Sequence, residues 1–363
     1  RTRRARQCGT MPSTAVIGRV FASEPTPGPT ATNSPLAGVT ITVDGQEQTM
    51  RTMSAGADAE IPDGEMRSTR LLISYANPDS KPSRETLNAA GLDVLQDYEK
   101  GSFLIVEPQG AVDSDTVETL MGDSAVAYVA PDYIMSIPQI EAAEEVRALD
   151  TDSVPNDPYL NKLWGVKNCG ATQVWPLKHD SPKIIVAVID SGVDYRHPDL
   201  KDNMWTREGQ HGYDFYENDT DPLDMENHGT HVAGTIAGIG NNGVGVVGVT
   251  WKAQIMALRF LGPDGSGATS DAVKCIDWAV NNGAHILCNS WGGPDSSPEL
   301  AEAVARAERK GVLFVAAAGN TGGTGNNNDL RPSYPASLSQ TNVISVGAID
   351  ENNARGSFSH YGK

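Results

Sequence analysis

The segment Val186-Ala187-Val188-Ile189-Asp190-Ser191-Gly192 decides the fold, together with Asn227-His228-Gly229-Thr230-His231-Val232-Ala233-Gly234 further along the chain. Residues 184–189 are six consecutive apolar residues, most of them β-branched, as is typical of a strand buried on both faces. Asp190 is the first polar residue after this run. Ligands of open α/β sheets bind at the carboxyl ends of the strands, so Asp190 is a candidate site residue.

A histidine opens the second segment. His228 precedes the small-residue stretch 229–238, which predicts a helix that packs closely on neighbouring backbone. A catalytic imidazole needs a partner that fixes its tautomer, and a buried carboxylate such as Asp190 can be that partner. Taken alone, Asp190 could instead be a turn residue, and His228 with His231 could be metal ligands. The glutamate of the HExxH arrangement of zinc proteases is absent, and we expect His231 to be a packed structural histidine.

Strands and helices alternate through the rest of residues 156–363. One predicted helix spans residues 269–281 and has a single apolar face. A second spans residues 298–310, with Ser297 as its N-cap, proline at its first position and Gly311 as its stop. The predicted strands are 184–189, 254–258, 284–288, 312–317 and 342–347. This alternation predicts an α/β fold, a parallel sheet with helices on both faces.

A smaller α+β unit is predicted to precede this sheet, over residues 68–137. The pattern suggests the order β-α-β-β-α-β, the split arrangement of a small ferredoxin-like domain. Its predicted strands and helices include 71–75, 83–90, 103–106, 117–121 and 126–134, with Ser83 capping the first helix. An unrelated α+β domain is the alternative.

Two stretches have the composition of exposed chain. Residues 1–67 are rich in Pro, Thr, Ser, Gly and Ala, which predicts a flexible leader with a short strand near residues 38–43. Residues 138–155 form an acidic linker, and we expect a maturation cut in or next to it because exposed linkers are easily cleaved.

Composition narrows the classes of function. The net charge of −18 disfavours nucleic acid as a partner, while it keeps an extracellular protein soluble and supplies carboxylates for calcium. No apolar run approaches the ~18 residues of a membrane span. Cys8, Cys169, Cys275 and Cys288 show no CxxC spacing, and we expect Cys275 and Cys288 to be buried free thiols.

Four motifs in this order resemble the subtilisin family of serine proteases. They are VAVIDSGVDYRHPDL at 186–200, HGTHVAGTIAG at 228–238, NSWGGP at 289–294 and VAAAGN at 315–320. NDPY at 156–159 and YDF at 213–215 make the chain most similar to the thermitase branch. The resemblance runs from about residue 156 onward. It implies a subtilisin-like fold and a secreted, monomeric serine endopeptidase that hydrolyses polypeptide substrates through an acyl-enzyme.

The resemblance also implies roles for individual residues. His228 would be the general base, Asp190 its carboxylate partner and Asn320 the oxyanion-hole donor. The substrate would lie between two extended segments whose residues are Gly265, Ser266, Gly267, Ser290, Trp291 and Gly292, with Ala317 to Gly319 as a wall of the S1 pocket. Trp291 replaces a smaller aliphatic residue, so we expect a reshaped apolar subsite and a preference for apolar or bulky side chains. Residues 68–137 would be a propeptide that assists folding and acts as an intramolecular inhibitor.

Calcium is the cofactor that the resemblance implies. The ligands of a strong structural site would be the carboxylates of Asp157 and Asp199, the side chain of Asn242 and the carbonyls of Ile239, Val244 and Val246. Oxygen ligands with two carboxylates suit this hard cation. Asp214, Asp219 and Asp221 could form a weaker second site, or could simply be a solvated acidic loop.

The nucleophile is missing from this sequence. The family's serine lies in a Gly-Thr-Ser-Met-Ala type motif after the oxyanion asparagine, and residues 321–363 contain none. We therefore expect that the sequence is a fragment of a longer protein, without its true start and its nucleophile, and that the fragment alone is inactive. The alternatives are a catalytically dead peptide-binding protein and an inhibitor or chaperone role for residues 70–137.

Overall fold

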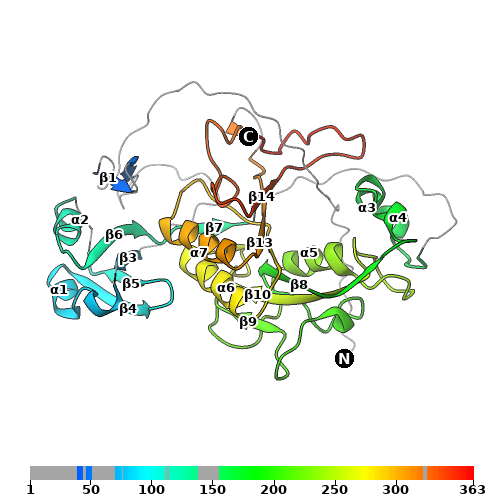
Figure 1. Cartoon of the computed structure of the whole chain (residues 1–363), viewed down its shortest axis with the longest axis horizontal. Helices are drawn as coiled ribbons and strands as arrows, with labels where there is room; N and C mark the ends of the chain where they lie inside the picture. Colours follow the sequence, from blue (N-terminus) through cyan, green and yellow to red (C-terminus); the bar gives the residue numbers. More distant parts are fainter. Residues whose placement is uncertain are drawn as a thin grey trace, which may run out of the picture.

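The computed structural model describes residues 39–43, 46–50, 70–75, 77–110, 112, 114–137, 155–321 and 325–363 (Figure 1). Strands β1 (Val39–Val43) and β2 (Gln46–Met50) pair in an antiparallel hairpin, which confirms the short strand expected near residues 38–43. The rest of the predicted leader and residues 138–154 of the predicted linker lie outside the described residues.

A parallel sheet forms the centre of residues 155–363. In the part of the chain that the structure describes, it has six strands in the order β14-β13-β12-β8-β10-β9. Each pair of neighbours runs parallel, so all carboxyl ends lie at one edge. The strands are β8 (Asp180–Asp190), β9 (Gly212–Asp214), β10 (Lys252–Arg259), β12 (Ile286–Asn289), β13 (Leu313–Ala317) and β14 (Val343–Val346).

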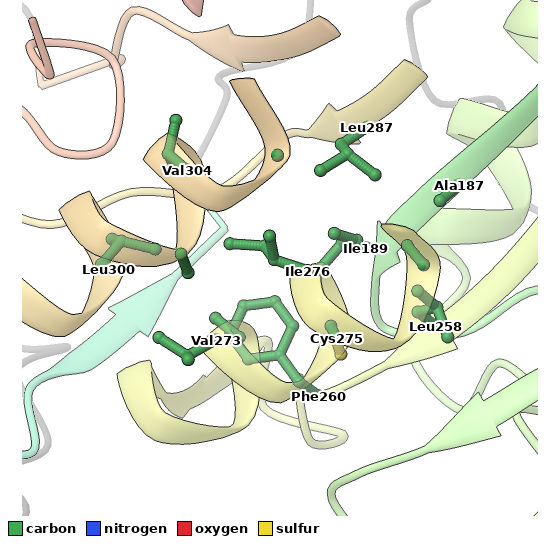
Figure 2. Packing of buried hydrophobic residues seen from close by; sticks show 14 of the residues in the cluster. Ala187, Ile189, Leu258, Phe260, Val273, Cys275, Ile276, Leu287, Leu300 and Val304 are labelled. Atoms are coloured by element: carbon green, nitrogen blue, oxygen red, sulfur yellow. The ribbon is translucent and has the colours of Figure 1, made fainter. Parts of the chain in front are cut away.

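Helices cover both faces of this sheet, as predicted. Alternate residues of β8 point to opposite sides: Val186 and Val188 pack with α5 (His228–Ala237), whereas Ala187 and Ile189 pack with α6 (Thr269–Asn281) and α7 (Pro298–Arg309). Figure 2 shows the second cluster, in which side chains of α6 and α7 meet those of the central strands. This two-sided burial explains why the strand is continuously apolar.

The two long helices begin and end close to where the sequence places them. Helix α6 spans Thr269–Asn281, the predicted range. Helix α7 spans Pro298–Arg309, and the Oγ atom of its N-cap Ser297 accepts a hydrogen bond from the backbone N–H of Leu300. The basic residues Arg306 and Arg309 in the last turn complement the helix dipole.

Residues 70–137 form a second, antiparallel sheet of order β4-β5-β3-β6. The chain order β3-α1-β4-β5-α2-β6 confirms the predicted β-α-β-β-α-β pattern. Its elements are β3 (Leu71–Tyr75), α1 (Arg84–Ala89), β4 (Leu92–Tyr98), β5 (Phe103–Pro108), α2 (Ser114–Met121) and β6 (Val126–Pro131). One face carries its own apolar cluster with α1 and α2. The other face supplies Leu72, Phe103 and Ile105 to the cluster that contains α6 and α7.

The last strand predicted in this region, 126–134, is wrong in one respect, because the structure breaks it in two. Strand β6 ends at Pro131, and β7 (Ile134–Ser136) leaves the sheet to pair antiparallel with β11 (Ser266–Ala268). Asp132 lies at the break with no exposed surface. Its carboxylate accepts hydrogen bonds from the backbone N–H and the hydroxyl of Ser270, 2.9 and 2.8 Å away. The apolar pattern alone predicts that the strand continues past Asp132, but this tertiary contact turns the chain there.

Candidate active site

Asp190 and His228 meet at the carboxyl edge of the parallel sheet. Asp190 is the last residue of β8, and His228 is the first residue of α5. The Nδ1 atom of His228 lies 2.8 Å from Oδ1 of Asp190, which also accepts the backbone N–H of Ser191 at 2.7 Å. Asp190 is 1% exposed, whereas a quarter of the His228 side chain is exposed. The carboxylate is therefore shielded from water while the imidazole can be reached.

The acidic surroundings of His228 set its pKa. Burial lowers the pKa of this imidazole. The hydrogen bond and charge of Asp190, with the charges of Glu226 and Asp224, act in the opposite direction and prevail, so the pKa of His228 is raised above its usual value. An imidazole with this partner on Nδ1 is suited to accept a proton on its other nitrogen and to remain stable when charged.

His231 is exposed, so the expectation of a packed structural histidine is wrong. The buried positions of α5 are Gly229, Ala233 and Ala237, which share the face against the sheet. His231 falls on a different side of the same helix. Among the described residues, no three His, Cys, Asp or Glu side chains are grouped as metal ligands would be, and the metal alternative for His228 and His231 gains no support.

Asn320 lies near the same edge, three residues after the end of β13. Ala317 is the last residue of that strand, and Gly319 follows with φ 115°, a conformation that side chains rarely adopt. A Cβ atom on Gly319 would lie 2.5 Å from Nδ1 of His360. The backbone must therefore pass very close to His360, whose N–H donates to the Gly319 carbonyl. This fixes the path of the segment that carries Asn320.

The two segments that are predicted to bind substrate are paired with another segment of this same chain. β7 pairs with β11, so Ser136 lies opposite Ser266 and Met135 lies opposite Gly267. On its other side, Ser136 exchanges two backbone hydrogen bonds with Gly292, at 3.1 and 2.9 Å. The N–H of Ile137 donates to the carbonyl of Gly265. Residues 134–137 thus form a third strand between the two segments.

Trp291 belongs to the core in this arrangement. Its side chain has no exposed surface, its ring packs edge-on against Phe260, and its indole N–H donates to the carbonyl of Ile189 at 2.9 Å. Met135, also fully buried, is part of the same cluster. Ser290, beside Trp291, is partly exposed. The indole is therefore part of the same buried cluster as a side chain of the inserted strand.

The structure brings together the side chains of three predicted calcium ligands, Asp157, Asp199 and Asn242. Asp157 and Asp199 are 5% and 1% exposed. Asp157 accepts the N–H of Asn241, while Asp199 accepts the N–H of Val246 and the side-chain amide of Asn242, all at 2.7 to 2.8 Å. Within the described residues, Oδ1 of Asp157 is buried without a hydrogen-bond partner. Two buried carboxylates and a spare oxygen suit a hard cation.

The backbone part of this ligand set lies in the same loop. The N–H of Ile239 donates to the carbonyl of Asp199, and the N–H of Val244 donates to the side-chain oxygen of Asn242. The weaker second site has less support. Asp214 forms a buried ion pair with Arg259 at 2.6 Å, so this carboxylate already has a cationic partner.

Two functional candidates were missed by the sequence analysis, namely Asp224 and Glu226. Glu226 accepts the backbone N–H of His228 at 2.8 Å, and Asp224 accepts hydrogen bonds from Ser191 and from the first turn of α5. The available signal in the sequence was the presence of acidic residues shortly before His228. The hydrogen bonds of these residues depend on how residues 222–230 fold, and the periodicity of apolar residues does not predict the fold of this loop.

Comparison with known proteins now decides the family. The profile of the subtilase family, Peptidase S8, matches residues 181–363. Thermitase of Thermoactinomyces vulgaris is 39% identical over 209 residues, which cover 57% of this chain and 70% of thermitase. The chain belongs to the subtilase family. The similarity to thermitase agrees with the branch suggested by its motifs.

Other relatives give this subtilase its context. A thermophilic serine proteinase of Bacillus sp. (strain AK1) is 39% identical over 226 residues, or 62% of this chain, and the chain spans 53% of that relative's length. An alkaline protease of Alkalihalobacillus alcalophilus is 35% identical over 316 residues, covering 81% of this chain and 76% of the relative. Fervidolysin of Fervidobacterium pennivorans, a keratinolytic enzyme related to subtilisin, superposes with a TM-score of 0.61 at 27% identity, covering 76% of this chain and 43% of fervidolysin.

Proposed function

We propose that this subtilase is part of a serine endopeptidase that hydrolyses polypeptides through an acyl-enzyme. The observation that carries the proposal is the 2.8 Å contact between Nδ1 of His228 and the buried carboxylate of Asp190. In this mechanism His228 takes a proton from the attacking serine and later gives it to the leaving amine. Asp190 holds the imidazole in one tautomer and stabilises its charged form. Asn320 would donate to the oxyanion.

No Gly-Thr-Ser motif occurs in these 363 residues. The proposal therefore concerns the protein in which a serine is supplied to His228 by a Gly-Thr-Ser motif. The competing function is a catalytically inactive protein that binds peptides or inhibits a protease. The pairing of β7 with β11 on one side and with Gly292 on the other is the observation that supports peptide binding of this kind.

We infer that residues 68–137 act as a propeptide and intramolecular inhibitor. Three contacts support this role. Strand β7 lies between the two proposed substrate-binding segments, Asp132 accepts hydrogen bonds at the start of α6, and the apolar face of the 70–137 sheet packs on α6 and α7. A segment paired on both sides would exclude a substrate from the same place. The maturation cut would then fall in the linker that follows.

The specificity follows from the same strand. Met135 is fully buried, and a Cβ atom on Gly293 would lie 3.1 Å from its sulfur. Phe260 and Trp291 belong to the same apolar cluster. We infer that a substrate presents an apolar, bulky side chain at the position of Met135. Gly293 and Trp291 would decide its shape.

Calcium and secretion complete the proposal. Asp157 and Asp199, with Asn242 and the carbonyls of the loop 239–246, would hold a structural calcium ion that neutralises two buried carboxylates. We propose secretion because of the acidic composition and the family. In the described part of the chain, no helix has the length and apolar character needed to cross a bilayer.

The test is to express the coding sequence as far as its stop codon and to assay cleavage of an unfolded, dye-labelled protein. The proposal predicts hydrolysis that is lost in His228→Ala. If the frame ends at codon 363, or if activity survives in His228→Ala, the catalytic proposal is wrong. Binding of the unfolded protein without cleavage would then support the competing function.

A further inference from the structure

A second carboxylate, that of Asp224, is hydrogen-bonded to residues next to the Asp190–His228 pair. Asp224 accepts five hydrogen bonds from two sides. Its Oδ1 atom accepts the hydroxyl of Ser191 at 2.9 Å and the backbone N–H groups of Glu226 and Asn227 at 3.0 and 2.8 Å. Its Oδ2 atom accepts the backbone N–H and the hydroxyl of Thr230 at 2.8 and 2.5 Å. One side chain thus joins the turn after β8 to the first turn of α5.

These are the two elements that carry the catalytic pair. Ser191 directly follows Asp190 and donates its N–H to the same Oδ1 atom that contacts His228. The hydroxyl of Ser191 accepts the backbone N–H of Gly229, the residue after His228. Thr230 in turn accepts the N–H of Asp194 through its hydroxyl. Every link of Asp224 therefore ends within a few residues of Asp190 or His228.

The backbone packing in this region leaves little room for adjustment. A Cβ atom on Gly229 would lie 2.0 Å from the carbonyl oxygen of Gly192. A Cβ atom on Gly192, which has φ 101°, would lie 2.6 Å from the carbonyl oxygen of Pro222. Helix α5 and the segment before it thus pack closely against the turn after β8. The hydrogen bonds of Asp224 stabilise this close backbone contact.

We propose that Asp224 is a positioning residue that holds the imidazole of His228 against Asp190. This inference rests on the proposed function, because it assigns a role within the pair that would perform the catalysis. Asp224 does not touch the imidazole. It acts through Ser191 on one side and Thr230 on the other. A misplacement of about 1 Å at a catalytic group can lower a rate on the order of 10²-fold. A residue that holds the imidazole of His228 in place therefore affects the rate of the chemical step.

Glu226 provides a matched comparison. It is also a carboxylate close to His228, and its charge also raises the pKa of the imidazole. Within the residues that the structure describes, however, the Glu226 carboxylate accepts only the backbone N–H of His228, through Oε2, and makes no hydrogen bond to the turn after β8. Removing its charge tests electrostatics alone, whereas removing the carboxylate of Asp224 tests electrostatics and position together.

The test uses the 363-residue chain labelled with 15N in its histidines, and NMR detection of the proton on Nδ1 of His228. The variant His228→Gln assigns the signal. In Asp224→Asn, we expect this proton to exchange with water faster, on the order of tenfold, as for the loss of one ordinary hydrogen bond. In Glu226→Gln, the pKa of His228 should fall while the exchange rate stays at the wild-type value.

Thr230→Val removes one of the links of Asp224 without changing any charge. We expect faster exchange of the Nδ1 proton in this variant too, with little change in the pKa of His228. It keeps the test decisive if Asp224→Asn does not fold. An unchanged exchange rate in Thr230→Val, or an Asp224→Asn variant that differs from wild type only in the pKa of His228, would overturn the proposal. The readout does not require peptidase activity, so failure of the proposed function would be seen separately.

Discussion

Neutralising Glu299 should stabilise this protein at neutral and alkaline pH. The side chain lies in the first turn of α7 and is 2% exposed. It accepts hydrogen bonds from Ser297 at 2.7 Å and from Ser74 of β3 at 3.4 Å. Burial raises the pKa of Glu299 from 4.5 to about 7, and the charge of Asp132 adds to the effect. The 70–137 region thus covers this carboxyl group, and burial favours the neutral form of Glu299.

The sign of the pH dependence follows from this shift. Between pH 4.5 and about 7 the folded protein binds a proton at Glu299 that the unfolded chain has released. The stability that this proton provides is complete below pH 4.5 and is lost as the pH rises through about 7. One pKa unit corresponds to about 1.4 kcal/mol, so the total loss is about 3 kcal/mol. The side chain in Glu299→Gln stays neutral at every pH, so this variant avoids the loss in unfolding free energy.

Urea unfolding followed by tryptophan fluorescence measures this effect between pH 5 and pH 8.5. The difference in unfolding free energy between Glu299→Gln and wild type should rise by about 2.5 kcal/mol across this range, because a small part of the loss has already occurred at pH 5. Glu302→Gln is the matched control, because Glu302 lies on the same helix with 53% of its side chain exposed. A difference that does not change with pH, or one that Glu302→Gln reproduces, would mean that Glu299 is not the group whose buried charge destabilises the protein.

Three further perturbations test other contacts. Asp132→Ala removes the acceptor of the Ser270 amide, so this amide should exchange with deuterium on the order of tenfold faster, and equal rates would contradict the assigned bond. Chelation of calcium should lower the melting temperature of the wild type but not of Asp157→Ala, and calcium at 100 times its dissociation constant should stabilise the wild type by about 2.7 kcal/mol. Leu300→Ala, in the core under α7, should cost about 2 to 5 kcal/mol in urea unfolding, and a change near zero would mean that the cluster is not packed as described.

The sequence predicts well what local chemistry determines. Helix α6 has the predicted bounds and α7 begins at the predicted proline, since an apolar face, a serine cap and a proline act within a few residues. The pairing of Asp190 with His228 could be anticipated because both residues sit at ends of regular elements at one edge of a parallel sheet.

Long-range contacts explain what the sequence did not predict. The break between β6 and β7 depends on Ser270, which lies 138 residues after Asp132. The role of Asp224 depends on a loop with no periodicity, in which Ser191 and Thr230 approach from different elements. Such bonds involve residues whose proximity exists only in the folded protein.

The proposed catalysis requires that Asp190 and His228 activate a serine. The most direct measurement is labelling of the product of the full coding sequence with a serine-reactive fluorophosphonate, followed by mass spectrometry of the labelled peptide. We predict one labelled serine in a Gly-Thr-Ser motif, no labelling in His228→Ala, and a rate lowered on the order of 10⁴-fold in Asp190→Asn, by analogy with the corresponding substitution in the Ser-His-Asp triad. A folded protein that is not labelled, or one that is labelled equally without His228, would contradict the account.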